Sequence, residues 1–413
     1  MRAARIDGQL IGVSALLVAY GLIILYSAGQ TDVPTRAAGV WWHQFIWVGV
    51  GLVAATVAFN VSFRLLEWLS PIVYGFSILL LVIVLVVGTG AGTAESSHSW
   101  LSIGGHQIGQ PSELAKVATV LMLARFLSSR KEPPRALHDL IGPGLIIGAP
   151  FLLVLKQPDL GSAIVFVGIF FAMLFWAGVR PRLLFLLASP GISLLLAFST
   201  VAWIVWILAF VLIIWAWRPY LWDWALCLIA NVVMGTLAMP LWKHLAPYQQ
   251  NRLLTFLNPE VDPRAAGYHA IQSRVAIGSG GWFGTGYTQG PQKRLAFLPE
   301  QHTDFVFSVV GEELGFLGVF VALALFLTLF FVLIRIARRA PDAFSSLVIF
   351  GIVGLFFTHV FENVGMTVNL MPITGIPLPF FSYGGSFFVI CSLCLGLAMR
   401  VAWDSRLSGY HDF

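Results

Sequence analysis

Charged side chains are scarce in this chain of 413 residues, where Asp, Glu, Lys and Arg together make up 10%. A soluble domain carries about 25% charged residues, so an ordinary soluble globular protein is excluded. Apolar side chains take their place: 58% of the residues are hydrophobic, and the mean hydropathy is +0.86. This composition predicts an integral membrane protein.

Cysteines and the spacings of common catalytic motifs are also largely missing. The three cysteines, Cys227, Cys391 and Cys394, lie inside apolar runs and are expected to be small core side chains. No zinc-type Cys/His spacing, Gly-x-Ser-x-Gly elbow or Walker loop occurs in the sequence. An ATP-driven pump is therefore not expected, and no residue is assigned as a metal ligand.

Long uncharged runs dominate the chain, and most reach the about 20 apolar residues that a helix needs to cross a bilayer. They are continuous, so they predict helices rather than the alternating strands of a barrel. The run 183–217 would reach about 52 Å as one helix. We therefore predict two helices that turn near Ser199 and Thr200, followed by a third from Trp224. The runs are 9–30, 37–63, 68–94, 140–155, 160–179, 183–217, 224–242, 314–334 and 363–399.

The expected architecture is all-α, a single membrane domain over the whole chain with about twelve transmembrane helices. Lys and Arg are absent from 93–112 and 362–379, and they gather at the opposite helix ends, as in 125–135 and 335–339. The positive-inside rule then places both termini in the cytoplasm. The first apolar run is long enough to remain as a span, so no cleaved signal peptide is expected. The net charge of +5 reflects these helix ends and does not indicate a nucleic-acid partner.

Residues 245–304 form a polar segment before the third-last span, and the same counting places them on the outer side. Most acids and bases outside the expected helices lie here. The segment is basic although it is on the outer side, and an anionic ligand is the simplest explanation. Its cations are Arg252, Arg264, Arg274, Lys293 and Arg294.

Two pairs of charged residues lie at expected membrane edges. In the first, Ser112 is the expected N-cap of a helix, so that Glu113 and Lys116 share one face. This pair is either an ordinary ion pair at a helix end or a buried lysine held for a phosphate. The second pair, Lys156 and Asp159, is either a structural ion pair or a charged site facing a wet cavity.

Three more polar clusters follow along the chain. Asp262 precedes a proline and is either a turn residue or a functional acid. The segment 300–304 is rich in polar side chains, and the next helix carries Glu312 and Glu313, which act either in function or in capping and packing. Prolines and glycines in 377–386 interrupt the start of the last span. Such backbone is tolerated where it lines a cavity.

Together these motifs resemble the SEDS family (shape, elongation, division and sporulation proteins), and within it the RodA branch. The matching stretches cover nearly the whole chain in family order, and the phrase Pro-Glu-x-His-Thr-Asp-Phe is typical of that branch. They are QPSELAK at 110–116, KQPDLG at 156–161, LNPEVDP at 257–263, AIGSGG at 276–281, FLPEQHTDF at 297–305, EELG at 312–315 and PLPFFSYGG at 377–385.

The resemblance implies a peptidoglycan glycosyltransferase that polymerises lipid II at the outer face of the cytoplasmic membrane during cell-wall elongation. It also implies a class B penicillin-binding protein as partner, and Asp262 as the essential acid of the outer segment. The family core has ten spans, so the twelve expected here include an extra pair between residues 183 and 243.

Glycosyl transfer from lipid II needs a base, cations for the leaving diphosphate and room for two polyprenyl tails. We assign Asp262 as the base and Lys116 and Lys156 as the cations. Acids expected to orient these lysines, or to bind a divalent cation such as Mg²⁺ or Mn²⁺, are Glu113, Asp159 and Glu300. The other candidate substrate-binding residues are His302, Thr303, Asp304 and Ser382.

The sequence departs from the family pattern in three places. Ser99 precedes Trp100 where the family has an arginine, so one expected cation is missing from the first outer loop. Phe387 follows Ser386 where a small residue is usual, which is expected to alter the packing of the last helix. The extra helix pair changes the surface that would meet a partner.

Two other functions fit parts of the same pattern. A flippase for a lipid-linked precursor would also need buried charges and broken helices, but it would need no base in an outer segment. A scaffold that only anchors a penicillin-binding protein would not require Lys116 and Lys156 in the membrane. A polymerisation assay on lipid II separates these alternatives from the enzyme.

Overall fold

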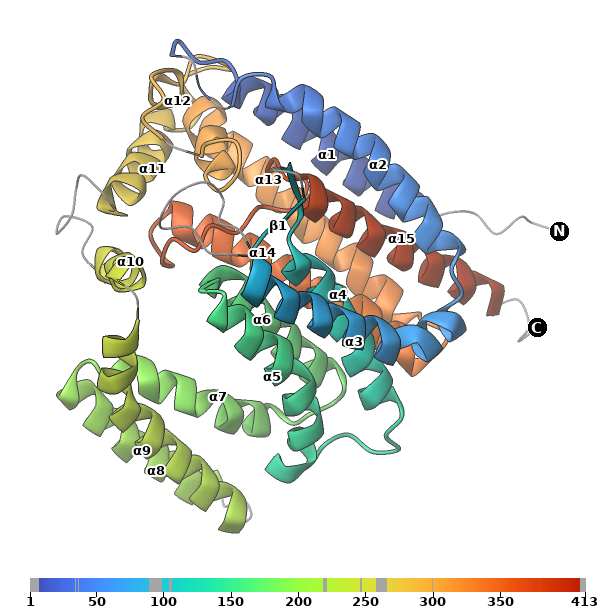
Figure 1. The fold of residues 1–413 in the computed structure, drawn as a ribbon, viewed down its shortest axis with the longest axis vertical. Coiled ribbons are helices and arrows are strands. Elements are labelled where there is room, and N and C mark those ends of the chain that lie inside the picture. Colours follow the sequence, from blue (N-terminus) through green and yellow to red (C-terminus); the bar gives the residue numbers. More distant parts are fainter. Residues whose placement is uncertain are drawn as a thin grey trace.

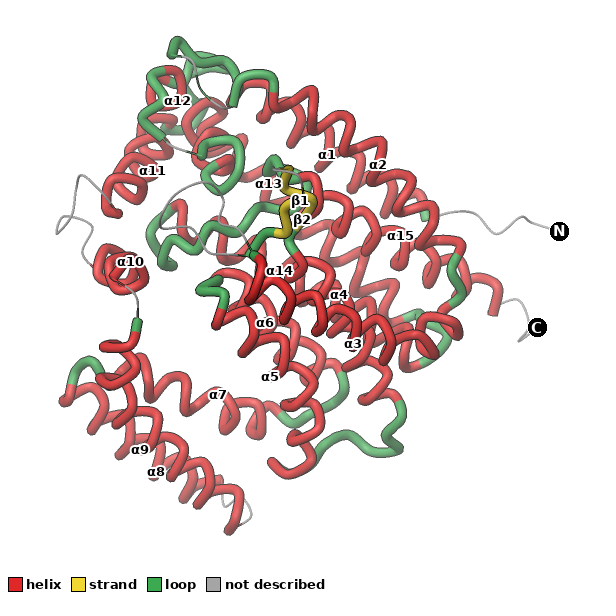
Figure 2. The backbone as a smooth tube through the Cα atoms, in the orientation of Figure 1, coloured by secondary structure: helices red, strands yellow, loops and turns green. Residues whose placement is uncertain are grey.

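The computed structural model describes residues 7–33, 35, 37–88, 99–103, 106–217, 221–245, 247–257, 266–298 and 300–408. Helices make up nearly all of this part of the chain, and two short strands form a hairpin (Figures 1 and 2). The elements are α1 (Gly8–Ala28), α2 (Val40–Asn60), α3 (Phe63–Val87), β1 (Leu101–Ile103), β2 (His106–Gly109), α4 (Pro111–Ser128), the 3₁₀ helix η1 (Leu137–Leu140), α5 (Ile141–Lys156), α6 (Leu160–Trp176), α7 (Pro181–Leu196), α8 (Thr200–Trp217), α9 (Leu221–His244), α10 (Pro247–Leu257), α11 (Ala266–Gly280), α12 (Pro291–Arg294), α13 (Val306–Arg338), α14 (Ala343–Thr367) and α15 (Gly385–Ser408).

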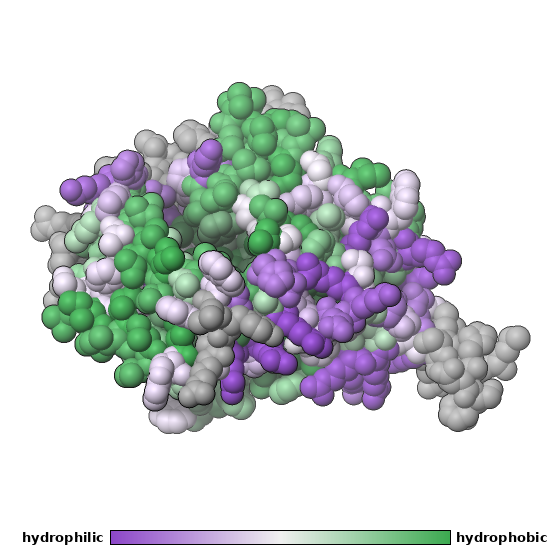
Figure 3. All heavy atoms as spheres, turned by 90° about the horizontal axis from the view of Figure 1, so that it is seen from below, coloured by the Kyte–Doolittle hydropathy of each residue, from purple (hydrophilic) through white to green (hydrophobic). Residues whose placement is uncertain are grey.

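The expected polytopic helix bundle is confirmed. Nine helices of the described part are long and apolar enough to cross a membrane: α1, α2, α3, η1 with α5, α8, α9, α13, α14 and α15. Helices α6 and α7 are apolar but shorter, and α4 is the remaining one of the twelve that the sequence predicts. Large apolar side chains such as Val86 and Trp222 are more than 80% exposed, as expected for surface that faces lipid. Figure 3 shows one such face, with broad hydrophobic areas and hydrophilic side chains gathered mainly on one side.

The most buried helices are α4 and α14, which lie in the middle of the bundle. Helix α14 packs against α4, α6 and α13, while α2 lies along α15, α3 along α4 and α1 along α13. The hydrophobic core therefore lies around α4, α13 and α14, the helices that also carry the polar motifs, and the other helices surround them (Figure 1).

The long run 183–217 is two helices, as its length predicts. Helix α7 ends at Leu196 and α8 begins at Thr200, and Ser199 N–H donates to the Leu196 carbonyl (3.0 Å) in the turn between them. Helices α7, α8 and α9 form a group at one side of the bundle with a small hydrophobic cluster of its own (Figure 1). Asn231 joins the three, because its amide donates to Ser189 Oγ (2.8 Å) and accepts from Trp206 Nε1 (3.0 Å).

The segment 245–304 contains more helix than its polar composition indicates. Its described parts include α10, α11 and α12, and α11 packs against α13. The strands β1 and β2 are a second addition: they pair antiparallel just before α4, with Ile103 opposite His106.

Helix α13 is broken at Gly315, whose φ of 61° and ψ of −158° lie outside the helical region. The turn after α11 fills the break. Thr285 N–H donates to the Glu312 carbonyl (2.9 Å), and Gly286 N–H donates to the Glu313 carbonyl (3.1 Å). These bonds satisfy carbonyls that the helix no longer pairs. A side chain on Gly315 would collide with the backbone of this turn, so the two segments fit only through glycine.

Candidate functional site

Helix α4 carries the first charged pair. Pro111 occupies its first position, and the N-cap is Gln110, with no side-chain cap bond. The expected N-cap role of Ser112 is therefore wrong: Ser112 lies one residue inside the helix, where its hydroxyl meets Ser162 Oγ of α6 at 3.4 Å. Glu113 follows in the first turn. One turn separates it from Lys116, as the spacing predicts.

Lys116 is completely buried, and polar groups surround its ammonium. Its Nζ donates to Glu113 Oε1 (2.8 Å) and to His359 Nε2 of α14 (2.9 Å), and it lies 5.6 Å from the centre of the Phe387 ring. His359 Nδ1 lies 3.0 Å from the Pro377 carbonyl, which can only accept. His359 is therefore neutral, with its proton on Nδ1. The pair belongs to the core and is not a surface ion pair at a helix end.

Asp159 and Lys156 do not form an ion pair with each other. Asp159 caps α6 by accepting from Ser162 N–H (3.0 Å), and its second oxygen accepts from Gln110 Nε2 (2.7 Å). Lys156 ends α5 with an exposed side chain, and within the described residues no hydrogen bond or ion pair occupies its ammonium. The interpretation of this pair as a structural ion pair is therefore wrong.

The polar face of α14 was not predicted. His359, Glu362 and Asn363 are completely buried and share one side of the helix, because they are three and four residues apart. Asn363 Nδ2 donates to the carbonyls of Asp304 (2.9 Å) and Ile376 (2.8 Å). Neither carboxyl oxygen of Glu362 makes a hydrogen bond of ordinary geometry within the described residues, and the Thr374 hydroxyl lies close to them. The helical spacing of these polar residues in an apolar span was the signal that could have found them.

The segments 300–305 and 377–383 are held together as one unit. Ser382 Oγ donates to the Thr303 carbonyl (2.6 Å) and accepts from Leu378 N–H (2.7 Å), and Tyr383 N–H donates to the His302 carbonyl (2.8 Å). Both interactions of Ser382 are with backbone. Its hydroxyl therefore positions the two segments.

Asp304 lies partly buried where these segments meet the outer helices. Burial and the neighbouring Glu300 carboxylate raise the pKa of Asp304 to about 7, against the opposing effect of Arg252 on α10. His269 of α11 stacks on Phe305, and burial together with Arg252 lowers its pKa. Helices α10 and α11 therefore come close to the 300–305 segment.

Lys293 and Glu313 form a second buried ion pair. The sequence indicated Glu313 as a candidate residue but did not predict its pairing with Lys293. Lys293 of α12 lies 2.5 Å from Glu313 Oε1 and donates to Ser27 Oγ of α1 (3.0 Å), and both charged side chains are completely buried. Ser27 Oγ in turn donates to Glu313 Oε2 (2.5 Å). Glu312 accepts from the backbone N–H of Gln292 (2.6 Å), which fixes the start of α12. Glu312 and Glu313 thus join α1, α12 and α13.

The structure brings most of the expected residues to one end of the bundle, in two groups joined by α14. Asn363 contacts the 300–305 segment, while His359, one turn away, contacts Lys116. Asp262 itself lies outside the described residues. The described helices on either side of it are α10 and α11, and Arg252 of α10 and His269 of α11 interact electrostatically with Asp304 and Glu300 respectively.

The fit of a divalent cation can be tested on the side chains. Within the described ranges, no three His, Cys, Asp or Glu side chains are arranged to hold a metal ion. Glu113 and Asp159 are near each other, but Lys116 and Gln110 occupy oxygens of these carboxylates. These residues do not fit a metal site, so no chemical step is assigned to a metal.

A polytopic helix bundle with buried ionisable side chains at one end defines a class of membrane protein that has a polar functional site beside the lipid. The family model described as "Cell cycle protein", covering FtsW, RodA and SpoVE, matches residues 8–407, and the chain belongs to this family. A peptidoglycan glycosyltransferase RodA of Treponema pallidum is 34% identical over 421 residues, with 93% of this chain and 94% of the relative covered. The peptidoglycan glycosyltransferase MrdB of Escherichia coli is 33% identical, with 96% and 93% covered.

Solved structures show the same fold. A chain from a study of the structural coordination of polymerization and crosslinking by a peptidoglycan synthase complex has a TM-score of 0.72 and 31% identity, with 97% of this chain and 98% of that chain covered. The rod shape determining protein RodA of Thermus thermophilus has a TM-score of 0.62 and 28% identity, with 97% of each chain covered.

Proposed function

We propose that this chain is a peptidoglycan glycosyltransferase that polymerises lipid II at the outer face of the cytoplasmic membrane during cell-wall elongation. Relatives named as such enzymes align with nearly its whole length. The observation that carries the proposal is the buried pair of Glu113 and Lys116, with His359 beside it, at the end of the bundle that also holds the 300–305 segment. Burying charge at this depth costs free energy, so charged side chains here indicate a functional site.

Asp262 is the proposed base. Its carboxylate takes the proton of an acceptor sugar hydroxyl as the oxygen attacks the anomeric carbon of the donor. The bond from that carbon to the diphosphate breaks, and the lipid diphosphate leaves with the electron pair. A positioned base of this kind contributes about 10²- to 10⁴-fold to the rate. The approach of α10 and α11 to Asp304 supports a location beside the site, since these helices flank Asp262.

The two lysines have different proposed roles. Lys156 is exposed and unpaired within the described residues, so it can contact the leaving diphosphate directly. Lys116 is enclosed by Glu113, His359 and Phe387. In this conformation its positive charge acts on the diphosphate at a distance, and its hydrogen bonds position Glu113 and His359.

The segment 300–304 is the proposed contact for the polar head of the substrate. Glu300 is exposed, and His302 Nε2 lies 3.9 Å from its carboxylate. Thr303 and Asp304 complete the segment, and Ser382 positions it through its backbone contacts.

A class B penicillin-binding protein is the proposed partner, because it would crosslink the glycan that this chain makes. A similar solved chain comes from a complex that couples polymerization with crosslinking. The bundle end that holds the 300–305 segment is the proposed outer side, with both termini in the cytoplasm, which agrees with the distribution of Lys and Arg.

The test is an assay of the purified full chain, reconstituted in liposomes that carry labelled lipid II. Polymerised glycan is the expected product. Movement of lipid II between the leaflets without polymer would instead identify a flippase. A chain that neither polymerises nor moves lipid II, alone or with a penicillin-binding protein, would be a scaffold.

A further inference from the structure

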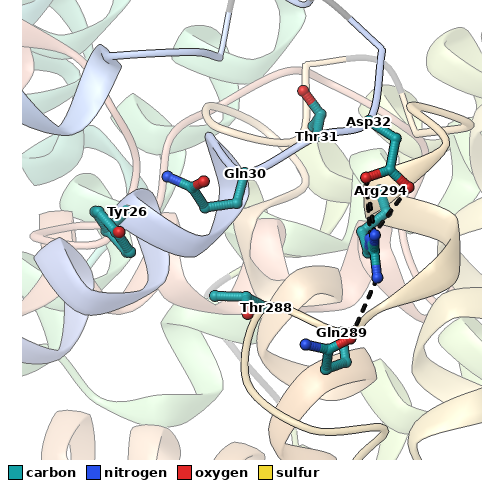
Figure 4. A pocket seen from close by; sticks show the side chains of 7 residues that line it. All are labelled: Tyr26, Gln30, Thr31, Asp32, Thr288, Gln289 and Arg294. Carbon is teal, nitrogen blue, oxygen red and sulfur yellow. Dashed lines mark hydrogen bonds and ion pairs between the residues drawn. The ribbon is translucent and has the colours of Figure 1, made fainter.

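A polar pocket lies away from the proposed reaction site, between the end of α1 and the turn that leads into α12 (Figure 4). Its volume is about 290 Å³. The lining side chains come from two segments that are far apart in the sequence and face one space. They are Tyr26, Gln30, Thr31, Asp32, Thr288, Gln289 and Arg294.

The pocket walls are firmly connected. Arg294 holds Asp32 through three hydrogen bonds of 2.9 to 3.2 Å, and Asp32 N–H donates to the Arg294 carbonyl (2.9 Å). Arg294 Nη1 also donates to Gln289 Oε1 (3.2 Å). Next to Arg294, the completely buried Lys293 is bonded to Ser27 of α1. The two segments therefore form a fixed cleft rather than a chance contact.

The charges of the pocket are already paired. Asp32 neutralises Arg294, the one cation among the described lining residues, so these residues offer little to a diphosphate or another anion. Hydrogen-bonding capacity remains in uncharged groups. Within the described residues, no hydrogen bond occupies the Gln30 amide, the Gln289 Nε2 or the Tyr26 hydroxyl, and the Tyr26 side chain is 40% exposed. Such a lining suits a neutral ligand rich in hydroxyl and amide groups.

We propose that this pocket binds an N-acetylated sugar unit of a glycan strand, a proposal that rests on the proposed function. The amides of Gln30 and Gln289 can pair with ring hydroxyls and an acetamido group. The Tyr26 ring packs edge to face against Trp41 (centroids 5.6 Å apart), and its exposed part offers an apolar surface for the C–H face of a sugar, with its hydroxyl as a polar end. Small-molecule pockets begin at about 300 Å³, so this volume is on the order of one sugar unit.

The location fits a strand that leaves the reaction site. Gln301, within the 300–305 segment, donates from Nε2 to the Ala28 carbonyl at the end of α1 (2.8 Å). The pocket and the proposed substrate contact therefore lie at the same end of the bundle. A sugar unit held here would keep a growing strand attached between additions.

Binding is measured first without any reaction. The full chain in lipid nanodiscs is titrated with a tetramer of N-acetylglucosamine, and saturable binding is expected. Tyr26→Ala and Gln30→Ala should each weaken it about tenfold, the effect of one lost favourable contact. Phe283→Ala is the matched control, because this aromatic side chain is 81% exposed on the neighbouring turn but outside the pocket.

Product length is the second measurement. With lipid II as substrate, Tyr26→Ala and Gln30→Ala should give shorter strands at an unchanged initial rate, and Phe283→Ala should give strands of ordinary length. Tetramer binding that is absent, or equal in both pocket variants and wild type, overturns the sugar site. Shorter strands without any change in tetramer binding would also overturn it and would indicate a different contact. If the tetramer binds as expected but lipid II is never polymerised, the sugar site stands and the proposed function fails.

Discussion

Among the acids of the site, Asp304 has a pKa near neutral pH. Its pKa is raised from 3.8 to about 7 by burial and by Glu300. The unfolded chain releases this proton near pH 4, whereas the folded chain keeps it until about pH 7. The folded state therefore loses stability as the pH rises between these values, and the loss persists above pH 7.

Asp304→Asn should remove this loss. In thermal unfolding, the variant should match wild type near pH 4 and have a higher Tm at about pH 8. Glu132→Gln, on an exposed carboxylate in another part of the molecule, serves as the control and should not change the pH dependence. An identical pH dependence in wild type and Asp304→Asn would show that Asp304 is not the perturbed group.

Glu362 is a buried carboxylate whose oxygens make no hydrogen bond of ordinary geometry in the described part of the chain, although the Thr374 hydroxyl lies close enough to interact with it. Glu362→Gln removes its charge at nearly constant volume. The unfolding free energy should stay equal or rise by about 1–3 kcal/mol, because a buried charge without an ion-pair partner costs more than a neutral amide in the same place. Polymerisation should nevertheless fall about tenfold, equal to about 1.4 kcal/mol in the barrier, since Glu362 lies in the field of Lys116 and Asp159.

The pair of measurements separates function from folding. A variant that is more stable and fully active would show that Glu362 has no part in the reaction. A variant that is less stable would show that the carboxylate has a partner that holds it.

Individual residues could be anticipated from sequence where their partners are near in the chain. Glu113 and Lys116 are one turn apart, so their contact followed from helical spacing. His359, which completes this cluster, is 243 residues from Lys116, and no local pattern indicates such a contact. Lys293 was assigned to an outer polar segment, but α12 places it in the core against Glu313.

At the scale of elements, the pair of Lys293 and Glu313 connects α12 with α13, and Ser27 adds α1. Lys293→Met alone or Glu313→Leu alone leaves a buried charge without its partner and should cost about 3–5 kcal/mol of stability. The double variant, Lys293→Met with Glu313→Leu, should recover most of this loss. Thermal unfolding of the four proteins gives the cycle.

The size of the coupling decides the interpretation. Losses that simply add in the double variant would show that the two charges are independent. Recovery in the double variant without recovery of polymerisation would show that the pair has a catalytic effect in addition to its structural one.

Element boundaries were predictable where apolar length sets them and less so where tertiary contacts do. The turn between α7 and α8 followed from the length of the run, since one helix would exceed the bilayer. Helices α10 and α11 lie in a segment of mixed composition, which does not predict that α11 packs on α13 and α10 on α11. The break in α13 depends on the backbone of a turn about 30 residues earlier in the chain, which the glycines alone do not specify.

At the scale of the molecule, the three-helix group α7, α8 and α9 determines the path from the bundle to the outer segment. Three spans place the turn at Ser199 on the outer side and the start of α9 on the inner side. In intact cells, Ser199→Cys should react with a membrane-impermeant maleimide, and Trp222→Cys, at an 87% exposed position near the start of α9, should react only after the membrane is opened. The native cysteines are buried, so little background is expected.

The opposite labelling pattern would contradict this topology. Reaction of Trp222→Cys from outside would mean that α7 to α9 do not cross the membrane three times. The side of the outer segment would then have to be established separately, for example with a cysteine at Gln289.

The fold class could be predicted at this scale because the bilayer imposes it: apolar runs of sufficient length must be helices. The meeting of α4, α14 and the 300–305 segment could not, since it depends on which helices pack together. The most direct test of the central claim is the polymerisation of lipid II by purified wild type and Asp262→Asn, with folding checked by thermal unfolding. We predict polymer from wild type and none from an equally stable Asp262→Asn, whereas strands of wild-type length from that variant would contradict the account.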